Sequence, residues 1–91
     1  MPEFVIEREM PGVANMTPEQ AEATARASIR VLQDLGPGIR WMRSFVTDNK
    51  IYCVYFASDI ELIREHARRV GIPANRIEAV RAMVDPAEFK N

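Results

Sequence analysis

The stretch IRWMRSFVTDNKIYCVYFA, residues 39–57, decides the fold. Its two halves, 39–47 and 50–57, are rich in aromatic and β-branched residues, which favour strands. Asp48-Asn49 between them is a favourable pair for a tight hairpin turn. The stretch therefore predicts a β-hairpin in the middle of the chain.

The segments on either side of the hairpin predict two more strands. In residues 3–9, Phe4 and Ile6 alternate with Val5 and Glu7, which is the period of a half-buried strand. Residues 76–85 predict a last strand through their spaced apolar residues, ending at a proline. Each of these strands is separated from the hairpin by a segment with helical spacing.

The two helical segments carry clear start and stop signals. Thr17-Pro18-Glu19-Gln20 forms a capping box with proline at the first helical position, and Gly36-Pro37-Gly38 predicts the stop, which gives a helix over 18–35. A second, shorter helix opens at Ser58 or Asp59 and ends before Gly71.

Strand, helix, hairpin, helix, strand is the split β-α-β order. Right-handed crossovers then place both helices on one face of a four-stranded antiparallel sheet, so the fold class is α+β, a ferredoxin-like βαββαβ sandwich. Residues 1–91 are too few for two cores, so the chain is one domain. One face of the sheet is left uncovered.

Hairpin pairing across Asp48-Asn49 sorts the side chains of the two middle strands between the sheet faces. Small and aliphatic residues suit the face under the helices, and four aromatic rings on the other face predict a homodimer of α/β-barrel-like association, because soluble monomers rarely leave so much apolar area wet. The inward set is Met42, Ser44, Val46, Ile51, Cys53 and Tyr55, and the outward set is Trp41, Arg43, Phe45, Tyr52, Val54 and Phe56.

Composition narrows the function classes. Twelve basic against thirteen acidic residues, without a basic run, argue against nucleic-acid binding. Charges near the N-terminus and the lack of a long apolar stretch argue against a signal peptide and membrane insertion, so we expect a cytoplasmic protein. A single cysteine rules out an internal disulfide and a thiolate cage.

Two constellations are candidates for chemistry. On the covered side, His66 lies in the middle of the apolar helix face and can approach Cys53, which is either a nucleophile or soft-metal pair or ordinary core packing. On the open side, Glu7, Trp41, Arg43 and Tyr52 form a candidate ligand-binding cleft.

Glu7 on the open side also has two other interpretations. Glu7 could join a metal site with His66 and Cys53, or it could pair with Arg43 as an ion pair at a subunit interface. No phosphate loop, catalytic triad or paired-cysteine motif is found, so the sequence gives little support to an enzyme.

Several segments resemble the bacterial nickel-binding-protein-like family, otherwise a domain of unknown function. They are FVIEREMPG (4–12), VTDNKIYCVY (46–55), IREHA (63–67), IPAN (72–75) and VDP (84–86). The resemblance covers nearly the whole chain. It implies a ferredoxin-like fold, a homodimer, nickel as the bound ion in some members, and no established catalytic activity.

The chain departs from the family at one position. Many members have a histidine after Trp-X in the second strand, where this chain has Arg43, and a guanidinium does not bind metal ions. Two hypotheses therefore stay open: a non-enzymatic homodimer that binds nickel, or a small-molecule-binding protein or cofactor-free enzyme that uses the open-side cleft.

Overall fold

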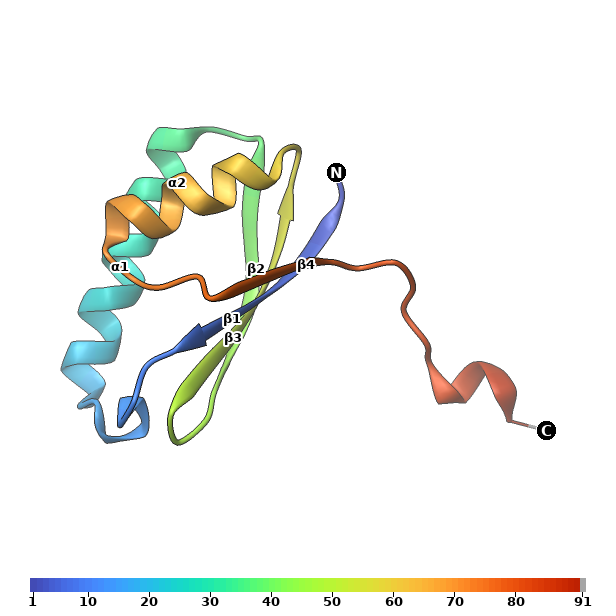
Figure 1. The fold of residues 1–91 in the computed structure, drawn as a ribbon, viewed down its shortest axis with the longest axis horizontal. Helices are drawn as coiled ribbons and strands as arrows, with labels where there is room; N and C mark the ends of the chain where they lie inside the picture. The colour runs from blue at the N-terminus through green and yellow to red at the C-terminus, as the bar shows by residue number, and fades with distance from the viewer. Residues whose placement is uncertain (91) are drawn as a thin grey trace.

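The computed structural model describes residues 1–90 and has the predicted order of elements (Figure 1). Four strands and two helices are joined by short connections, with a 3-10 turn after the first strand and another near the C-terminus. The elements are β1 (Glu3–Glu9), η1 (Val13–Asn15), α1 (Pro18–Leu35), β2 (Ile39–Val46), β3 (Lys50–Ala57), α2 (Ile60–Val70), β4 (Arg76–Ala79) and η2 (Pro86–Phe89).

Local signals explain the helix ends. The Thr17 hydroxyl accepts from the Gln20 amide, and the Gln20 side chain accepts from the Thr17 amide, so the predicted capping box is formed. Asp59 caps α2 by accepting from the amide of Glu61. Gly71 ends α2 with φ near +82°, a conformation that favours glycine.

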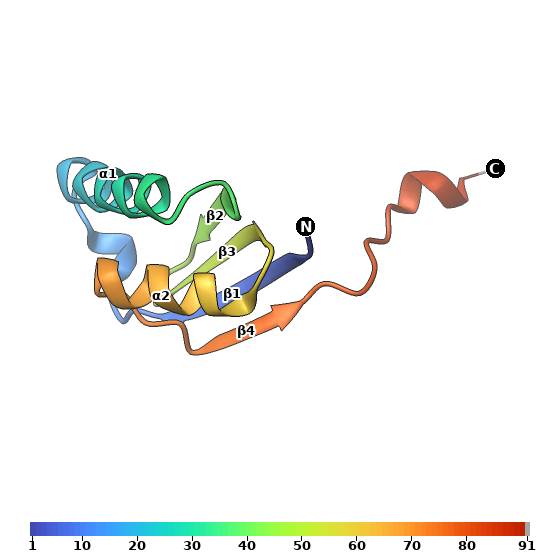
Figure 2. The same ribbon diagram turned by 90° about the horizontal axis from the view of Figure 1, so that it is seen from above.

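The sheet has the strand order β2-β3-β1-β4 with antiparallel neighbours, and both helices pack on one face (Figure 2). This is the predicted α+β arrangement. We call the face under α1 and α2 the covered face and the opposite one the open face. Within residues 1–90, none of the helices is long and apolar enough to cross a membrane.

The core lies between the covered face and the helices. Ile6, Ile63 and Ala57 have no exposed area, and the remaining buried members come from the same layer. They are Phe4, Ile39, Cys53 and Tyr55. Inward positions of β1 and β3 thus follow the predicted alternation.

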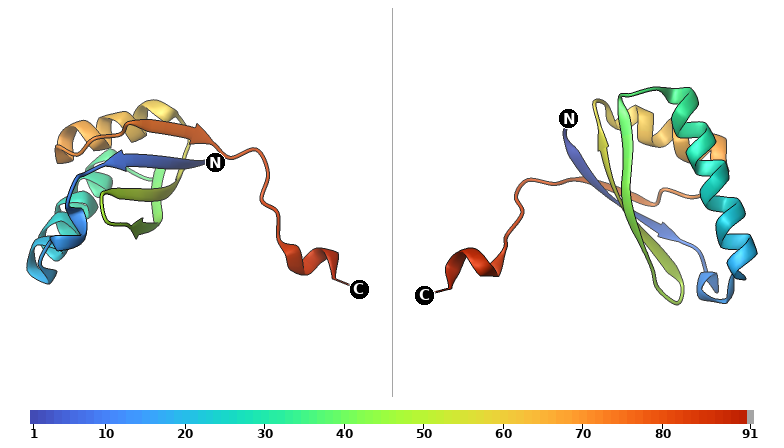
Figure 3. Two further views of the ribbon diagram at one scale, coloured as in Figure 1. Left: turned by 60° about the horizontal axis from the view of Figure 1, so that its bottom comes forward. Right: turned by 180° about the vertical axis from the view of Figure 1, so that it is seen from behind.

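The predicted last strand is too long. Pairing with β1 ends at Ala79, and the amide of Val80 makes the final bond to this strand, on the carbonyl of Glu3. Beyond it the chain leaves the body as a C-terminal arm, residues 81–90, which Figures 1 and 3 show projecting away from the sheet. With no neighbouring strand beyond Glu3, the apolar spacing of 80–84 cannot form a ladder.

The predicted position of Trp41 on the open face is also wrong. A β-bulge between Trp41 and Arg43 shifts the register of β2, so that Trp41 pairs with Tyr55 and Arg43 with Val54. Because paired residues share a sheet face, the bulge turns Trp41 to the covered face, and the inward assignment of Met42 does not hold either, since 39% of its surface is exposed. Ser44, which pairs with Cys53, and Phe45, which pairs with Tyr52, keep their predicted faces.

Candidate ligand site

A partly enclosed cavity of about 140 Å³ lies between α1 and the covered face of the sheet. Its wall is largely apolar. Ala25 and Ser28 of α1 face Trp41 of β2 and Tyr55 of β3, with Met16 and Ile72 closing it from the connecting loops. An apolar cavity with a few polar groups is the usual form of a small-molecule site.

Arg8 contributes a buried positive charge to this wall. Only 1% of its surface is exposed, because β1 turns it to the same side as Phe4 and Ile6. Its Nη1 donates to the carbonyl of Pro73 at 2.7 Å, and its Nε donates to Cys53 Sγ at 3.4 Å. Its Nη2 is buried without a hydrogen-bond partner within residues 1–90. A guanidinium stays charged at any pH at which a protein is folded.

A chain of hydrogen bonds runs along the wall from β2 to β3. Trp41 Nε1 donates to Ser44 Oγ at 2.9 Å, and Ser44 Oγ donates to Cys53 Sγ at 3.0 Å. The sulfur is thus contacted from one side by Ser44 and from the other by Arg8. These contacts fix the indole of Trp41 at the cavity.

His66 and Tyr55 are two buried aromatic side chains between the helices and the covered face. His66 is fully buried, and its ring centroid lies 5.5 Å from that of Tyr55. Burial, together with the charge of Arg8, lowers the pKa of His66 to about 4, while the backbone of Ser28 acts weakly in the opposite direction. Burial raises the pKa of Tyr55 to about 12. Both rings are therefore neutral near pH 7, and Arg8 carries the charge.

The three residues proposed to bind a metal are not brought together. Cys53 and His66 lie on the covered side, as predicted, but Glu7 pairs with Tyr52 and therefore lies on the open face. Within residues 1–90 there is no cluster of three histidine, cysteine or acidic side chains that could hold a metal ion. The guanidinium of Arg8, 3.4 Å from the sulfur, also opposes a cation at Cys53. The donors that residues 1–90 bring together do not fit a nickel site.

The predicted open-side cleft is only partly assembled. Glu7 and Tyr52 are cross-strand partners, and Arg43 sits one row away on β2, but Trp41 is on the other face. Glu7 makes an ion pair of 3.5 Å with Lys50. The predicted partner Arg43 is instead exposed.

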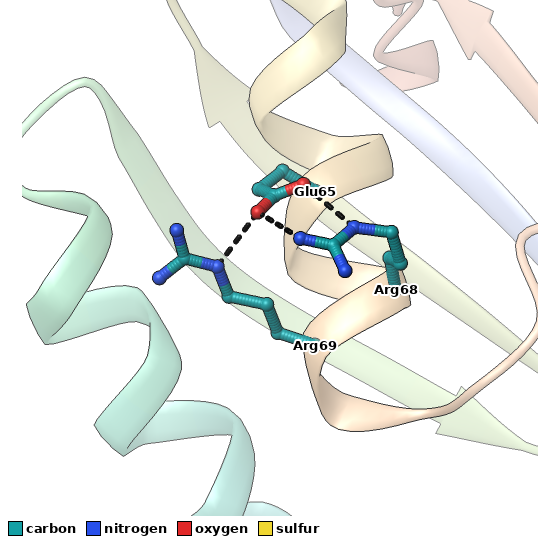
Figure 4. Close-up of polar contacts among 3 residues, drawn as sticks. All are labelled: Glu65, Arg68 and Arg69. Carbon is teal, nitrogen blue, oxygen red and sulfur yellow. Dashed lines mark hydrogen bonds and ion pairs between the residues drawn. The ribbon is translucent and has the colours of Figure 1, made fainter.

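The outer surface of α2 carries a separate charged cluster (Figure 4). Glu65 accepts hydrogen bonds from both Arg68 and Arg69, and these bonds lower the pKa of Glu65 to about 2. All three side chains come from one helix and are satisfied within it. The cluster is thus a solvated helix surface.

Sequence reasoning missed Arg8. The signal was present, because Arg8 continues the two-residue period of Phe4 and Ile6 on the inward side of the first strand. An inward arginine is unusual, since arginine is rarely fully buried without a partner. The alternation of the first strand was therefore sufficient to predict that the side chain of Arg8 points into the core.

Comparisons with known proteins identify the family through one family model and the fold through one solved structure. The family model described as "Nickel responsive protein SCO4226-like" matches residues 4–80. The crystal structure of SCO4226 from Streptomyces coelicolor A3(2) superposes with a TM-score of 0.75 at 20% identity, and the match covers 90% of this chain and 99% of that one. No curated protein matches the sequence.

Proposed function

We propose that this chain, which belongs to the SCO4226-like family of nickel responsive proteins, is a homodimeric binding protein that takes up a small molecule in the cavity between α1 and the sheet. The cavity itself carries the proposal. It combines apolar walls, a buried charge and a fixed indole in one partly enclosed space. No reaction is proposed for it.

Filling the cavity tests the proposal. Ala25 lines it from α1, so Ala25→Phe places a ring in the space that a ligand would occupy. We expect small aromatic and acidic metabolites to change the fluorescence of Trp41 saturably in the wild type and not in A25F. Ala23→Phe, at an exposed position of the same helix, is the matched control and should bind like the wild type. Equal responses of wild type and A25F would place the ligand elsewhere.

The homodimer is proposed from the open face. Val5 and Phe45 are 37% and 56% exposed there, beside the half-buried rings of Tyr52 and Phe56 and the side chain of Val54. We call these five residues the open-face patch. Charges of both signs flank the patch on the same face, with Glu3, Glu7 and Glu78 beside Arg40, Arg43, Lys50 and Arg76. A two-fold copy of this mixed rim can pair opposite charges around an apolar centre.

The C-terminal arm supports the same assembly. Met83, Val84 and Phe89 are each 73% exposed on a segment that projects from its own subunit, and these residues follow the part matched by the family. Packing against a second copy of the chain would bury these apolar side chains. Sedimentation at micromolar concentration tests this: we expect a dimer, and a stable monomer would refute it.

Nickel binding is a second candidate, favoured by the description of the family. Since one subunit does not supply a fitting donor set, any nickel site would combine open-face carboxylates of two subunits, with Glu7 of the inner strand β1 among them. Calorimetric titration of tag-free protein with nickel chloride tests it. A binding heat that the wild type gives and Glu7→Gln does not would support this site. The absence of any heat above the buffer control would contradict nickel binding.

A further inference from the structure

We infer that the cavity selects an organic anion, a carboxylate attached to a small apolar body, and that Arg8 is the residue that recognises the charge. This inference rests on the proposed ligand-binding role of the cavity. It adds the chemical class of the ligand and names the selecting side chain.

The charge balance of the cavity supports an anion. Arg8 is 99% buried, and no carboxylate of residues 1–90 pairs with it. Its hydrogen bonds go to a carbonyl and to a sulfur, the latter a weak acceptor, and its guanidinium carbon lies 6.0 Å from the centre of the Tyr55 ring, so the positive charge has neutral partners and no anionic one within residues 1–90. Nη2 keeps its N–H groups without an acceptor. A buried unpaired charge is costly, and a bound carboxylate would compensate it through charge-assisted hydrogen bonds.

The other polar groups do not change this preference. Tyr55 and His66 are neutral near pH 7, so the site contains no negative group that would attract a cation. Ser44 uses its hydroxyl hydrogen on Cys53 and accepts from Trp41. The positive charge of Arg8 therefore dominates the electrostatic potential in the cavity.

The size of the cavity sets the size of the apolar body. An engineered protein cavity of about 150 Å³ lined by aliphatic and aromatic side chains binds benzene. The present cavity, about 140 Å³ with a largely apolar wall, has room for one ring or a short branched chain. Benzoate is a suitable probe, and benzamide is its neutral counterpart of nearly equal shape.

The test compares benzoate and benzamide by titration of the full chain, followed by Trp41 fluorescence and by amide chemical shifts. Hydrogen bonds to charged groups predict that benzoate binds about 10- to 100-fold more tightly than benzamide. In Arg8→Met this preference should disappear, leaving benzoate no tighter than benzamide. Arg43→Met, the same exchange on the open face, should keep it.

The outcomes separate this inference from the proposed function. If both probes bind equally in the wild type, or if R8M keeps the preference, the anion inference is wrong while ligand binding in the cavity stands. If neither probe perturbs residues around the cavity, both are wrong. Should R8M fail to fold, Arg8→Gln gives the same decision: it removes the charge but keeps a hydrogen-bond donor, so loss of the preference for benzoate supports the inference and an unchanged preference opposes it.

Discussion

The two faces of the sheet depart from the usual distribution of polarity in opposite directions. The covered face, under the helices, contains a fully buried guanidinium, whereas the open face presents Phe45 and Val5 to solvent. Globular proteins normally bury apolar groups and leave charges outside. We propose a different absent partner for each face: an anion for the covered face and a second subunit for the open face.

The largest expected effect is on the open face. Phe45→Glu places a charge in the open-face patch, and in a two-fold dimer it does so twice, so we expect the dissociation constant of the dimer to rise by about 100-fold or more. The monomer should stay folded because Phe45 is 56% exposed. Sedimentation and circular dichroism measure the two quantities.

Ile29→Glu is the matched control for that change. Ile29 is also an exposed apolar residue, at 45%, but it belongs to α1. It should leave the dimer intact. Dissociation of both variants would mean that the open-face patch is not the interface.

The next effect concerns the covered face. In the absence of ligand, Arg8→Met removes a buried charge that has no anionic partner and keeps the length of the side chain, so the free energy of unfolding should rise by about 1–3 kcal/mol, despite the lost bond to Pro73 and the lost contact with the Tyr55 ring. Arg43→Met on the open face should change it by no more than about 0.5 kcal/mol. Urea unfolding measures both, and a destabilised R8M would show that Arg8 is already compensated in the free protein.

A smaller effect is expected from His66 through pH. Its pKa is depressed from an ordinary value of 6.5 to about 4 in the folded chain, so between these values the unfolded state binds more protons. Stability should therefore fall as the pH drops through this window, with a contribution of up to about 1.4 kcal/mol per pH unit. Comparing the pH dependence of wild type with His66→Gln isolates it, since the carboxylates are common to both. Parallel curves would refute it.

The smallest effect is expected outside both faces, on α2. Glu65→Gln removes the charge that Arg68 and Arg69 contact, but all three side chains are on the solvated helix surface (Figure 4). Exposed ion pairs contribute little. The midpoint of thermal unfolding should stay within error of the wild type at neutral pH, and a clear drop would mean that the cluster contacts something besides α2.

Most of the fold could be predicted because its signals are local. The capping box at Thr17, the turn at Asp48-Asn49 and the glycine after α2 each act through neighbouring residues, and each is found where the sequence placed it. The end of β4 was not predictable in this way. It depends on where β1 stops offering a partner, which is a contact between distant residues.

The site was harder to predict for the same reason. Strand alternation correctly placed Cys53 inward, and helical spacing did the same for His66. Alternation could also have placed Arg8 there, but the position of Trp41 depends on a bulge that composition does not reveal. The predicted open-side cleft was therefore wrong in including Trp41. The cavity itself arises from the small side chains of α1 facing β2 and β3, and a spacing rule within one element does not show it.

The bulge in β2 also affects how homologous positions are assigned. A relative with an unbroken second strand aligns with this chain only if a one-residue gap is placed at 41–43. Without that gap, residues written in the same column before the bulge belong to opposite sides of the sheet. Equivalence of Arg43 with another protein's residue two positions after a tryptophan therefore has to be decided on superposed strands, because counting along the sequence would interchange a cavity-lining side chain with one on the open face.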